Sequence, residues 1–445
     1  MNNVYIYTVL LIGLVACQKP QKAQQTDQLA ISDDSLLNLV QYQTFNYFWE
    51  GAEPVSGMAP ERIHTDGDYP DKDPNVVTSG GSGFGVMAIL VGIERGFISR
   101  QQGVERFEKI LNFLETADKF HGVYPHWWYG DTGKVKPFGA NDNGSDLVET
   151  AFLMQGLLCV RQYFREGSDR EKSIANRINE VWKSVEWDWH TRNGQDVLYW
   201  HWSPDKEWIM NFAVTGYNEC LIMYVLGASS PTHSIKSSVY HSGWAKSGEI
   251  VNDSAHSQYG YHLDMRHNDS QQFGGPLFWA HYSYLGLDPR QLKDRYADYW
   301  QHNVNHTLIN RQWCIENPLD YEGYGADCWG LTASYSPRFY AAHRPKEEDF
   351  GVITPTAALS SFPYTPEYSM DFLRFIYASD SLIGKYGPYD AFSLEHDWYK
   401  PWYLAIDQGP IPVMIENYRT GLLWKLFMSA PEVRAGLEKL GFEYE

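Results

Sequence analysis

The chain has 445 residues and carries 36 basic against 55 acidic side chains, a formal net charge of −19 at pH 7. Surfaces that bind nucleic acids are basic, so this balance argues against a nucleic-acid partner, and it also disfavours polyanionic substrates. Aromatic residues make up 16% of the chain, with 17 tryptophans and 31 tyrosines. Aromatic rings are ordinary core and interface material, but they also form flat platforms for sugar rings. The length allows two or three domains, or one large helical barrel.

The first residues have the pattern of an export signal. Residues 4–16 form an apolar run that is too short to span a bilayer, which takes ~20 residues. The run ends at Cys17 in a stretch that resembles a bacterial lipobox, although the first three residues contain no Lys or Arg. We therefore expect residues 1–17 to be a lipoprotein signal peptide, with Cys17 lipidated, and residues 18–33 to be a flexible tether. The protein would be exported to the periplasm or outer membrane and held by its lipid alone.

The other four cysteines do not define a disulfide framework. Cys159 and Cys220 lie in apolar segments that are predicted to be helical, which indicates buried thiols. An exported location permits disulfides, so a bridge between Cys314 and Cys328 stays open.

Two early segments resemble ligand-binding motifs. After an amphipathic helix predicted at 36–49, residues 66–73 form an acid-rich loop that lacks the glycine and closing glutamate of a calcium-binding hand. We interpret it as a solvated loop. Residues 83–88 imitate a dinucleotide-binding fingerprint, but no strand precedes them, so this interpretation is rejected.

From residue 79 onward, a loop followed by a mostly apolar helix recurs, and a more polar helix often comes next. The apolar helices are predicted to begin near Ser82, Ser145, Asn211, Pro276, Thr354 and Pro410. The polar partners are predicted at 101–117, 170–185, 290–307, 366–377 and 430–440. Apolar helices inside a ring of amphipathic ones predict an all-α fold, an (α/α)6 barrel over residues 34–445. In such a barrel the inner helices run the same way, so their N-termini and preceding long loops meet at one cleft.

The helix predicted near Ser145 carries acids where its composition predicts burial. Asp146 and Glu149 share one face at spacing i, i+3, and Asp142 lies one turn earlier. Capping of the helix N-terminus explains Asp142 and in part Asp146. It does not explain Glu149, because a buried charge needs a partner or a use. Perturbed acids cluster at functional sites, so these residues predict a polar working cleft.

Two further acids have contrasting environments. Glu219 is the only charge in the third apolar helix, predicted at 211–227, so burial should raise its pKa and suit it to be a general acid. The alternative is a structural acid that is hydrogen-bonded in the core. Asp407 lies just before the proline-started sixth helix, where the helix N-terminus should keep it ionised. Environments that push two pKa values apart are typical of an acid/base pair.

Other charged residues are interpreted as structural. His302 and His306 stand at i, i+4 without the glutamate of the zinc-protease motif, so we expect surface residues and no metal. Glu416 is expected to pair with Arg419.

Several motifs together resemble a known family. They are Gly275–Tyr284, Trp329–Ser334, Gly351–Ala357, Phe362–Pro366, Tyr386–Ser393 and Ala405–Pro410, with Asn218-Glu219 and the three acids from Asp142 to Glu149. The combination resembles bacterial glucoamylase-like glycoside hydrolases, and more closely the β-1,2-glucanases of glycoside hydrolase family 144. The resemblance covers nearly everything after the tether.

The resemblance implies an inverting enzyme that hydrolyses β-1,2-linked glucose chains to sophorose or short sophorooligosaccharides, without a metal or other cofactor. Glu219 would be the general acid and Asp407 the general base. The substrate-binding residues would be Asp142, Asp146, Glu149, Trp279, Tyr282, Tyr364 and Trp402. The partner would be a glucan, and a monomer is expected. Whether cleavage is internal or terminal depends on loops whose shape the sequence does not give.

Two functions from other classes remain open. A surface glycan-binding lipoprotein without catalysis would use the aromatic residues, but it would not need acids inside apolar helices. A polysaccharide lyase on the same barrel normally needs cationic groups to neutralise a uronate, whereas the predicted cleft is acidic.

Overall fold

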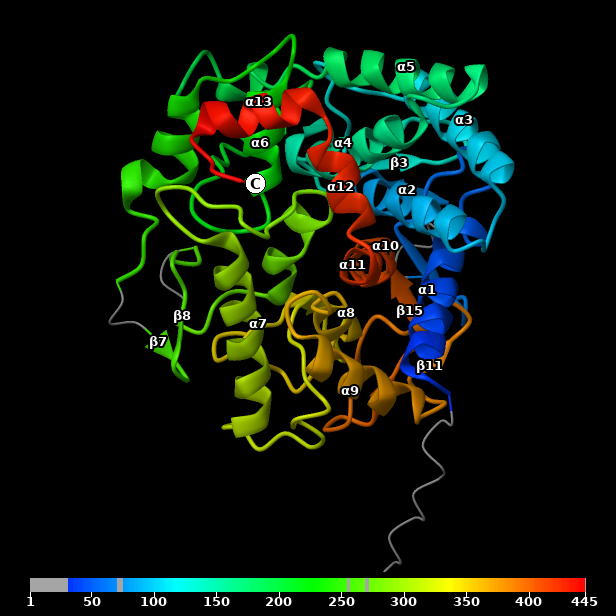
Figure 1. Ribbon diagram of the computed structural model, residues 1–445, viewed down its shortest axis with the longest axis vertical. Helices are drawn as coiled ribbons and strands as arrows, with labels where there is room; N and C mark the ends of the chain where they lie inside the picture. The colour runs from blue at the N-terminus through cyan, green and yellow to red at the C-terminus, as the bar shows by residue number, and fades with distance from the viewer. Residues whose placement is uncertain (1–30, 70–74, 254–256, 269–271, 445) are drawn as a thin grey trace, which may run out of the picture.

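The computed structural model describes residues 31–69, 75–253, 257–268 and 272–444, and it is largely helical (Figure 1). Cys17, nearly all of the predicted tether and residues 70–73 of the acid-rich loop lie outside the described residues. Among the described helices, none combines the length and apolarity that crossing a membrane requires.

The apolar segments form a set of buried helices. They are α2 (Ser79–Glu94), α4 (Leu147–Phe164), α6 (Leu221–Ser229), α8 (Pro355–Leu359) and α11 (Pro410–Arg419). Helix α2 packs against α4 and α11, α4 also packs against α6, and α11 against α8. Figure 1 shows α11 near the centre of the view, with α2 on one side of it and α7 on the other.

The helix expected from Pro276 is instead two short 3₁₀ turns, η4 (Leu277–Ala280) and η5 (Tyr282–Tyr284). Backbone amides in this segment bond to other parts of the chain. The amide of Leu277 donates to the carbonyl of Leu331, and that of Phe278 donates to Thr332 Oγ1. These contacts compete with helical hydrogen bonds, and the segment still packs against α6 through η5.

Further helices, most of them more polar, lie outside this set. They are α1 (Asp33–Trp49), α3 (Arg100–Thr116), α5 (Asp169–Ser184), α7 (Tyr299–Glu316), α9 (Pro366–Tyr377), α12 (Leu422–Met428) and α13 (Pro431–Leu440). Capping boxes at Ser99 and Ser168 start α3 and α5. Helix α7 begins later than expected because Asp294 Oδ1 accepts the amides of Tyr296 and Ala297, which makes a turn before the Asp298 cap.

The strands are short, and no sheet in the described ranges has more than three of them. Those that matter for the site are β1 (Arg62–His64) with β15 (Trp402–Leu404), and β5 (Ser145–Asp146) with β6 (His201–Trp202). The others are β2 (Val76–Thr78), β3 (Trp127–Tyr129), β4 (Val135–Lys136), β7 (Ser257–Gln258), β8 (Tyr261–His262), β9 (Ala333–Ser334), β10 (Ala341–Ala342), β11 (Ile383–Gly384), β12 (Gly387–Pro388), β13 (Phe392–Ser393) and β14 (Trp398–Tyr399). Single turns complete the chain: α10 (Ala405–Gln408), η1 (Trp189–Thr191), η2 (Val239–Trp244) and η3 (Lys246–Gly248).

The expectation that His302 and His306 lie on the surface is wrong. Both lie on α7 and are fully buried. His267, from the chain before this helix, is buried beside them. The Nε2 atoms of His267 and His302 lie 2.8 Å apart, and His306 Nε2 lies 2.8 Å from the carbonyl of Gly275. Burial lowers the pKa of His306 to about 4 and that of His302 well below its usual value. These neutral histidines join α7 to the loop before η4, which the polar sequence of the helix does not reveal.

Glu416 does not form the expected main pair with Arg419. Its two carboxylate oxygens accept from Arg95 Nε at 2.6 Å and Arg95 Nη2 at 2.8 Å, while Arg419 bonds to Asp34 and to two amide side chains of α1. Both pairings fasten the C-terminal half of the chain to the N-terminal helices.

The four described cysteines are all buried and free, including Cys314 and Cys328.

Candidate active site

Two small sheets bring distant segments to the start of the buried helices. Strand β15 pairs with β1 and leads directly into α10, which carries Asp407. Strand β5 pairs with β6 so that Asp146 lies opposite His201. Asp146 is also the cap of α4, and its Oδ1 accepts the backbone N–H of Glu149 at 2.9 Å. The N-terminal ends of helices therefore carry the predicted acids, as the sequence pattern indicates.

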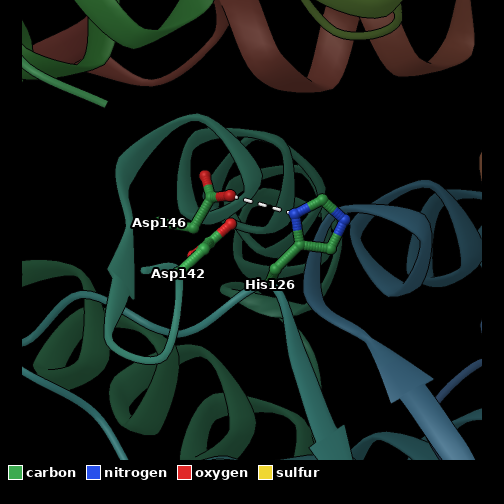
Figure 2. A group of neighbouring side chains, drawn as sticks. All are labelled: His126, Asp142 and Asp146. Carbon is green, nitrogen blue, oxygen red and sulfur yellow. Dashed lines mark hydrogen bonds and ion pairs between the residues drawn. The ribbon is translucent and has the colours of Figure 1, made fainter. Parts of the chain in front are cut away.

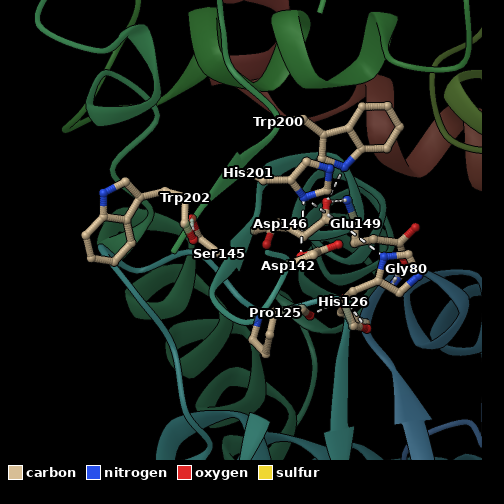
Figure 3. A network of polar contacts seen from close by, with 12 residues as sticks. Gly80, Pro125, His126, Asp142, Ser145, Asp146, Glu149, Trp200, His201 and Trp202 are labelled. Carbon is tan, nitrogen blue, oxygen red and sulfur yellow. Dashed lines mark hydrogen bonds and ion pairs between the residues drawn. The ribbon is translucent and has the colours of Figure 1, made fainter. Parts of the chain in front are cut away.

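Asp146 is buried and saturated with donors (Figure 3). Trp200 Nε1 donates to Oδ1 at 2.8 Å, and His126 Nδ1 lies 3.0 Å from Oδ2. Burial alone would raise the pKa of this carboxyl, but the hydrogen bond to His126 and the charges of His201 and His126 lower it. Asp142 lies beside it, with Oδ1 3.4 Å from His201 Nδ1. Asp146 is therefore held ionised in a fixed orientation.

His126, Asp142 and Asp146 lie close enough to one another to resemble a cation site, with their potential ligand atoms within 4.8 Å (Figure 2). Without a cation, the charges of the group favour a protonated histidine. Although burial lowers the pKa of His126, the charges of Glu149 and Asp146 and the hydrogen bond to Asp146 raise it to about 10. A protonated imidazole donates hydrogen bonds and offers no lone pair to a metal. His126 and Asp146 form an ion pair in this arrangement, with His126 Nδ1 3.0 Å from Asp146 Oδ2.

Glu149 lies in the first turn of α4, and only 3% of it is exposed. Its Oε2 accepts the backbone N–H of Gly80 at 2.8 Å, at the start of α2. A side chain on Gly80 would place its Cβ 2.2 Å from that oxygen, so only glycine fits this contact. Burial raises the pKa of Glu149 to about 7, and the charges of Asp146 and Glu61 contribute in the same direction.

The expectation that Glu219 lies inside a helix is wrong. Helix α6 begins at Leu221, and Glu219 lies half-buried in the turn before it. The side chain of Asn218 accepts the amide of Cys220 at 3.0 Å and so fixes this turn. Burial raises the pKa of Glu219 to about 7, with a further contribution from the charge of Asp146. The predicted direction of the pKa shift is confirmed, while the turn places the carboxyl at a helix start instead of mid-helix.

Asp407 has the opposite electrostatics from those expected. It lies on the single turn α10, and 2% of it is exposed. Burial raises its pKa well above the usual value, and the charge of Asp390 and the hydrogen bond between the two carboxyls raise it further. The Tyr282 hydroxyl lies 3.5 Å from Asp407 Oδ1. The expected ionising effect of the α11 N-terminus is therefore outweighed by burial and a second carboxyl.

Tyr282 shows that the acids from three helix starts form one group. Burial raises the pKa of its hydroxyl well above the usual value, and the charges of Asp407, Glu149 and Glu219 all raise it further. Electrostatic effects of this kind act over short distances. The charges of Asp407, Glu149 and Glu219 therefore all act on Tyr282, whose hydroxyl lies 3.5 Å from Asp407 Oδ1, and Asp146 bonds to the backbone of Glu149.

The other predicted aromatic residues take different places. Trp279 is buried and in hydrogen-bonding distance of Glu219. Trp402 is half-buried, stacks on His64 with ring centroids 4.4 Å apart, and donates to Asp66 at 3.0 Å. Tyr364 is in the core, where its hydroxyl donates to the carbonyl of Ala280 at 2.8 Å. The structure does not bring Tyr364 to the acids.

Sequence reasoning missed several residues of the site. His126, Trp200 and His201 hold Asp142 and Asp146, and Glu61 and Asp390 raise the pKa of Asp407. A signal was present for the first three, since each histidine stands beside tryptophan in His126-Trp-Trp and Trp200-His-Trp. Glu61 and Asp390 lie in loops without any periodic pattern, so only the fold places them.

Comparison with known proteins gives consistent matches. The family described as "Putative glucoamylase" matches residues 211–431. An endo-β-1,2-glucanase from Chitinophaga pinensis, solved with sophorotriose and glucose, is 66% identical with a TM-score of 0.92, over 93% of this chain and 99% of that chain. A "putative glucoamylase" from Bacteroides caccae is 62% identical with a TM-score of 0.91, over 93% of this chain and 100% of that chain.

A curated relative is longer than this protein. The exo β-1,2-glucooligosaccharide sophorohydrolase of Parabacteroides distasonis, which acts at the non-reducing end, is 47% identical over 430 residues. The match covers 92% of this chain but spans only 58% of the relative.

Proposed function

The chain belongs to the family of bacterial β-1,2-glucanases, which are glucoamylase-like glycoside hydrolases, and we propose that it hydrolyses β-1,2-linked glucose chains with inversion. One observation carries the proposal beyond family membership: Glu219, Glu149 and Asp407 lie at the starts of three buried helical elements, and the charges of all three raise the pKa of the Tyr282 hydroxyl. Glycoside hydrolases use a pair of carboxyl groups on either side of the bond that is cleaved.

Glu219 has the properties of the general acid. Its pKa of about 7 leaves much of it protonated near neutral pH, so it can donate that proton to the glycosidic oxygen as the bond to the anomeric carbon breaks. Asp407 takes a proton from the water that attacks the opposite face of the sugar, so that no covalent glycosyl-enzyme forms. A raised pKa makes Asp407 a stronger base once it is ionised.

Asp142 and Asp146 are proposed to accept hydrogen bonds from sugar hydroxyls, oriented by His126 and His201. Trp279, Tyr282 and Trp402 supply apolar surface beside the acids. Tyr364 supports the site from the core, because its hydroxyl is bonded within η4.

We also propose that the buried elements form the inner ring of an (α/α)6 barrel. Contacts run in series from α2 through α4 and α6 to η5, and in the other direction from α2 through α11 to α8. His281, between η4 and η5, closes the series, because its Nε2 lies 2.9 Å from the hydroxyl of Ser361, just after α8. Amphipathic helices such as α3 and α5 cover the outside.

The activity is tested with a panel of linear glucans of β-1,2, β-1,3, β-1,4 and α-1,4 linkage, with the released oligosaccharides separated by chromatography. Release of sophorose or sophorooligosaccharides from the β-1,2-glucan alone is expected. Equal release from another linkage, or none from any, would contradict the proposal. Product sizes early in the reaction separate internal from terminal cleavage.

Lipid anchoring at Cys17 is a separate proposal that rests on the apolar run before it. Expressed in a related bacterium, the protein should fractionate with membranes and incorporate labelled fatty acid. Cys17→Ser should abolish the label and leave an unprocessed precursor. Unlabelled, fully soluble wild-type protein in the periplasm would contradict anchoring.

A further inference from the structure

A cavity of about 280 Å³ lies near the β5–β6 pair, and its lining includes Trp189, Trp208, Glu186, Asp188, Arg192 and Asn193. Trp202 of β6 packs edge-on against Trp189, with the two ring centroids 6.2 Å apart. The preceding strand residue, His201, contacts Asp142 instead. Successive residues of a strand point to opposite faces, and Figure 3 shows Trp202 directed away from the acids. The cavity is therefore next to the candidate active site but separate from it.

Trp189 offers this cavity a flat ring. Among the 17 tryptophans, all of which lie in the described ranges, Trp189 alone is more than a third exposed, at 38%. His121 stacks on it with ring centroids 3.8 Å apart and planes 12° apart. Trp208 forms another part of the lining, with its centroid 6.4 Å from that of Trp189. The indole is thus held in place by neighbouring rings while part of its surface stays open to a ligand.

Polar groups surround this ring. The side chains of Glu186 and Asp188 are 36% and 55% exposed. Each has one oxygen beside a histidine, at 3.1 Å and 3.0 Å, and a carboxylate has about four lone-pair sites, so both acids keep acceptors for hydroxyl groups. Arg192 lies in the same lining and brings N–H donors. Two carboxylates beside one guanidinium disfavour an anionic ligand. A flat apolar ring with acceptors and donors at its edge suits a sugar, which has C–H faces and hydroxyl edges.

Backbone strain also gathers at the cavity. His121, Arg192 and Glu207 have φ values of 54°, 51° and 51°. They stack on Trp189, line the cavity and precede Trp208, respectively. This left-handed conformation is unfavourable for residues such as these, and it persists at ligand-binding positions where the surrounding structure enforces it. The fold therefore maintains the shape of this cavity at a local cost in backbone conformation.

We propose that this cavity is a second binding site for the β-glucan: one glucose unit packs on Trp189, and its hydroxyl groups bond to the acids and the guanidinium around that ring. A volume of about 280 Å³ is close to the lower limit of small-molecule sites, roughly 300–1,000 Å³, and suits one unit of a chain. A chain held there keeps its other units at a raised local concentration near the catalytic acids. The site takes no part in bond cleavage. The identity of its ligand rests on the proposed function.

Trp189→Ala should affect long chains and spare short ones. On long β-1,2-glucan we expect KM to rise by roughly three- to tenfold with kcat unchanged, because the ring that covers one sugar face is lost. On short sophorooligosaccharides, whose cleavage needs only the catalytic site, kcat and KM should keep their wild-type values. Steady-state rates on substrates of both lengths measure the difference.

Binding is measured apart from cleavage in the Glu219→Gln background, by migration through gels that contain β-1,2-glucan. Adding Trp189→Ala should reduce the retardation of the protein. Adding Trp189→Phe, which keeps a flat ring, should retain most of it. Trp208→Ala changes another part of the lining, and it tests the cavity if Trp189→Ala does not fold.

Tyr42→Ala is the matched control, because it removes an exposed aromatic ring elsewhere. Tyr42 is 44% exposed and packs on Phe97, just after the C-terminal end of α2, whereas Glu149 bonds to Gly80 at the start of that helix. The control should match the wild type on long and short substrates.

Wild-type kinetics on long glucan in both Trp189→Ala and Trp208→Ala would overturn the proposal. An equal loss on long and short chains would also overturn it, because it would show that the ring supports β6 and His201 instead. If the wild type cleaves no β-1,2-glucan, the proposed function fails, which is a different result from an active wild type whose cavity variants are unchanged.

Discussion

Glu219→Gln should lower kcat on β-1,2-glucan by at least ~10²-fold, since general acid catalysis commonly contributes 10²–10⁴-fold. The amide keeps the shape of the side chain but has no proton to give to the leaving oxygen. Because the pKa of Glu219 is raised to about 7, wild-type activity should also fall as the pH rises through that value. Initial rates across pH for both proteins measure the two effects.

The control for Glu219→Gln is Glu53→Gln, the same chemical change in a buried glutamate that accepts the amides of Val55 and Ser56 in a loop. It should keep near-normal turnover. A substrate with an aryl leaving group needs little proton donation, so Glu219→Gln should recover much of its rate on an aryl β-sophoroside. Near-normal turnover of Glu219→Gln on the natural glucan would make Glu219 a structural acid.

Asp407→Asn should have a comparable effect, a loss of ~10² to 10⁴-fold in turnover, because the amide cannot accept the proton of the attacking water. Binding of a sophorooligosaccharide, measured by calorimetry, should be largely unchanged, and so should the thermal unfolding midpoint. The Asn side chain can still donate to Asp390 and accept from Tyr282. Loss of binding together with turnover would instead indicate a residue that holds the sugar.

The sequence predicts the helical class because the apolar runs that begin α2, α4, α6 and α11 are long and almost uncharged. It fails at η4 and η5, where loop segments far along the chain take the backbone hydrogen bonds. Composition alone carries no information on such long-range competition. The same reason hides the burial of His302 and His306, whose partners come from another loop.

The sequence identifies the acids of the site more reliably than it predicts their charge states. Glu149 and Glu219 stand out because they are isolated in apolar segments, and burial raises the pKa of each as expected. The charge state of Asp407 depends on Asp390 and Glu61. Glu61 comes to it through the β1–β15 pairing, and Asp390 through its backbone bond to Trp402. The local sequence does not show which residues the tertiary structure brings together, so it does not predict how their charges shift one another's pKa.

The stereochemistry of the first product tests the central claim most directly. Proton NMR of fresh β-1,2-glucan digests, recorded before the sugar anomers equilibrate, identifies the anomer released. An inverting reaction, with Asp407 activating water and no covalent intermediate, predicts the α-anomer from the β-linked substrate. Initial release of the β-anomer would contradict the account, because it requires a covalent glycosyl-enzyme and a different task for Asp407.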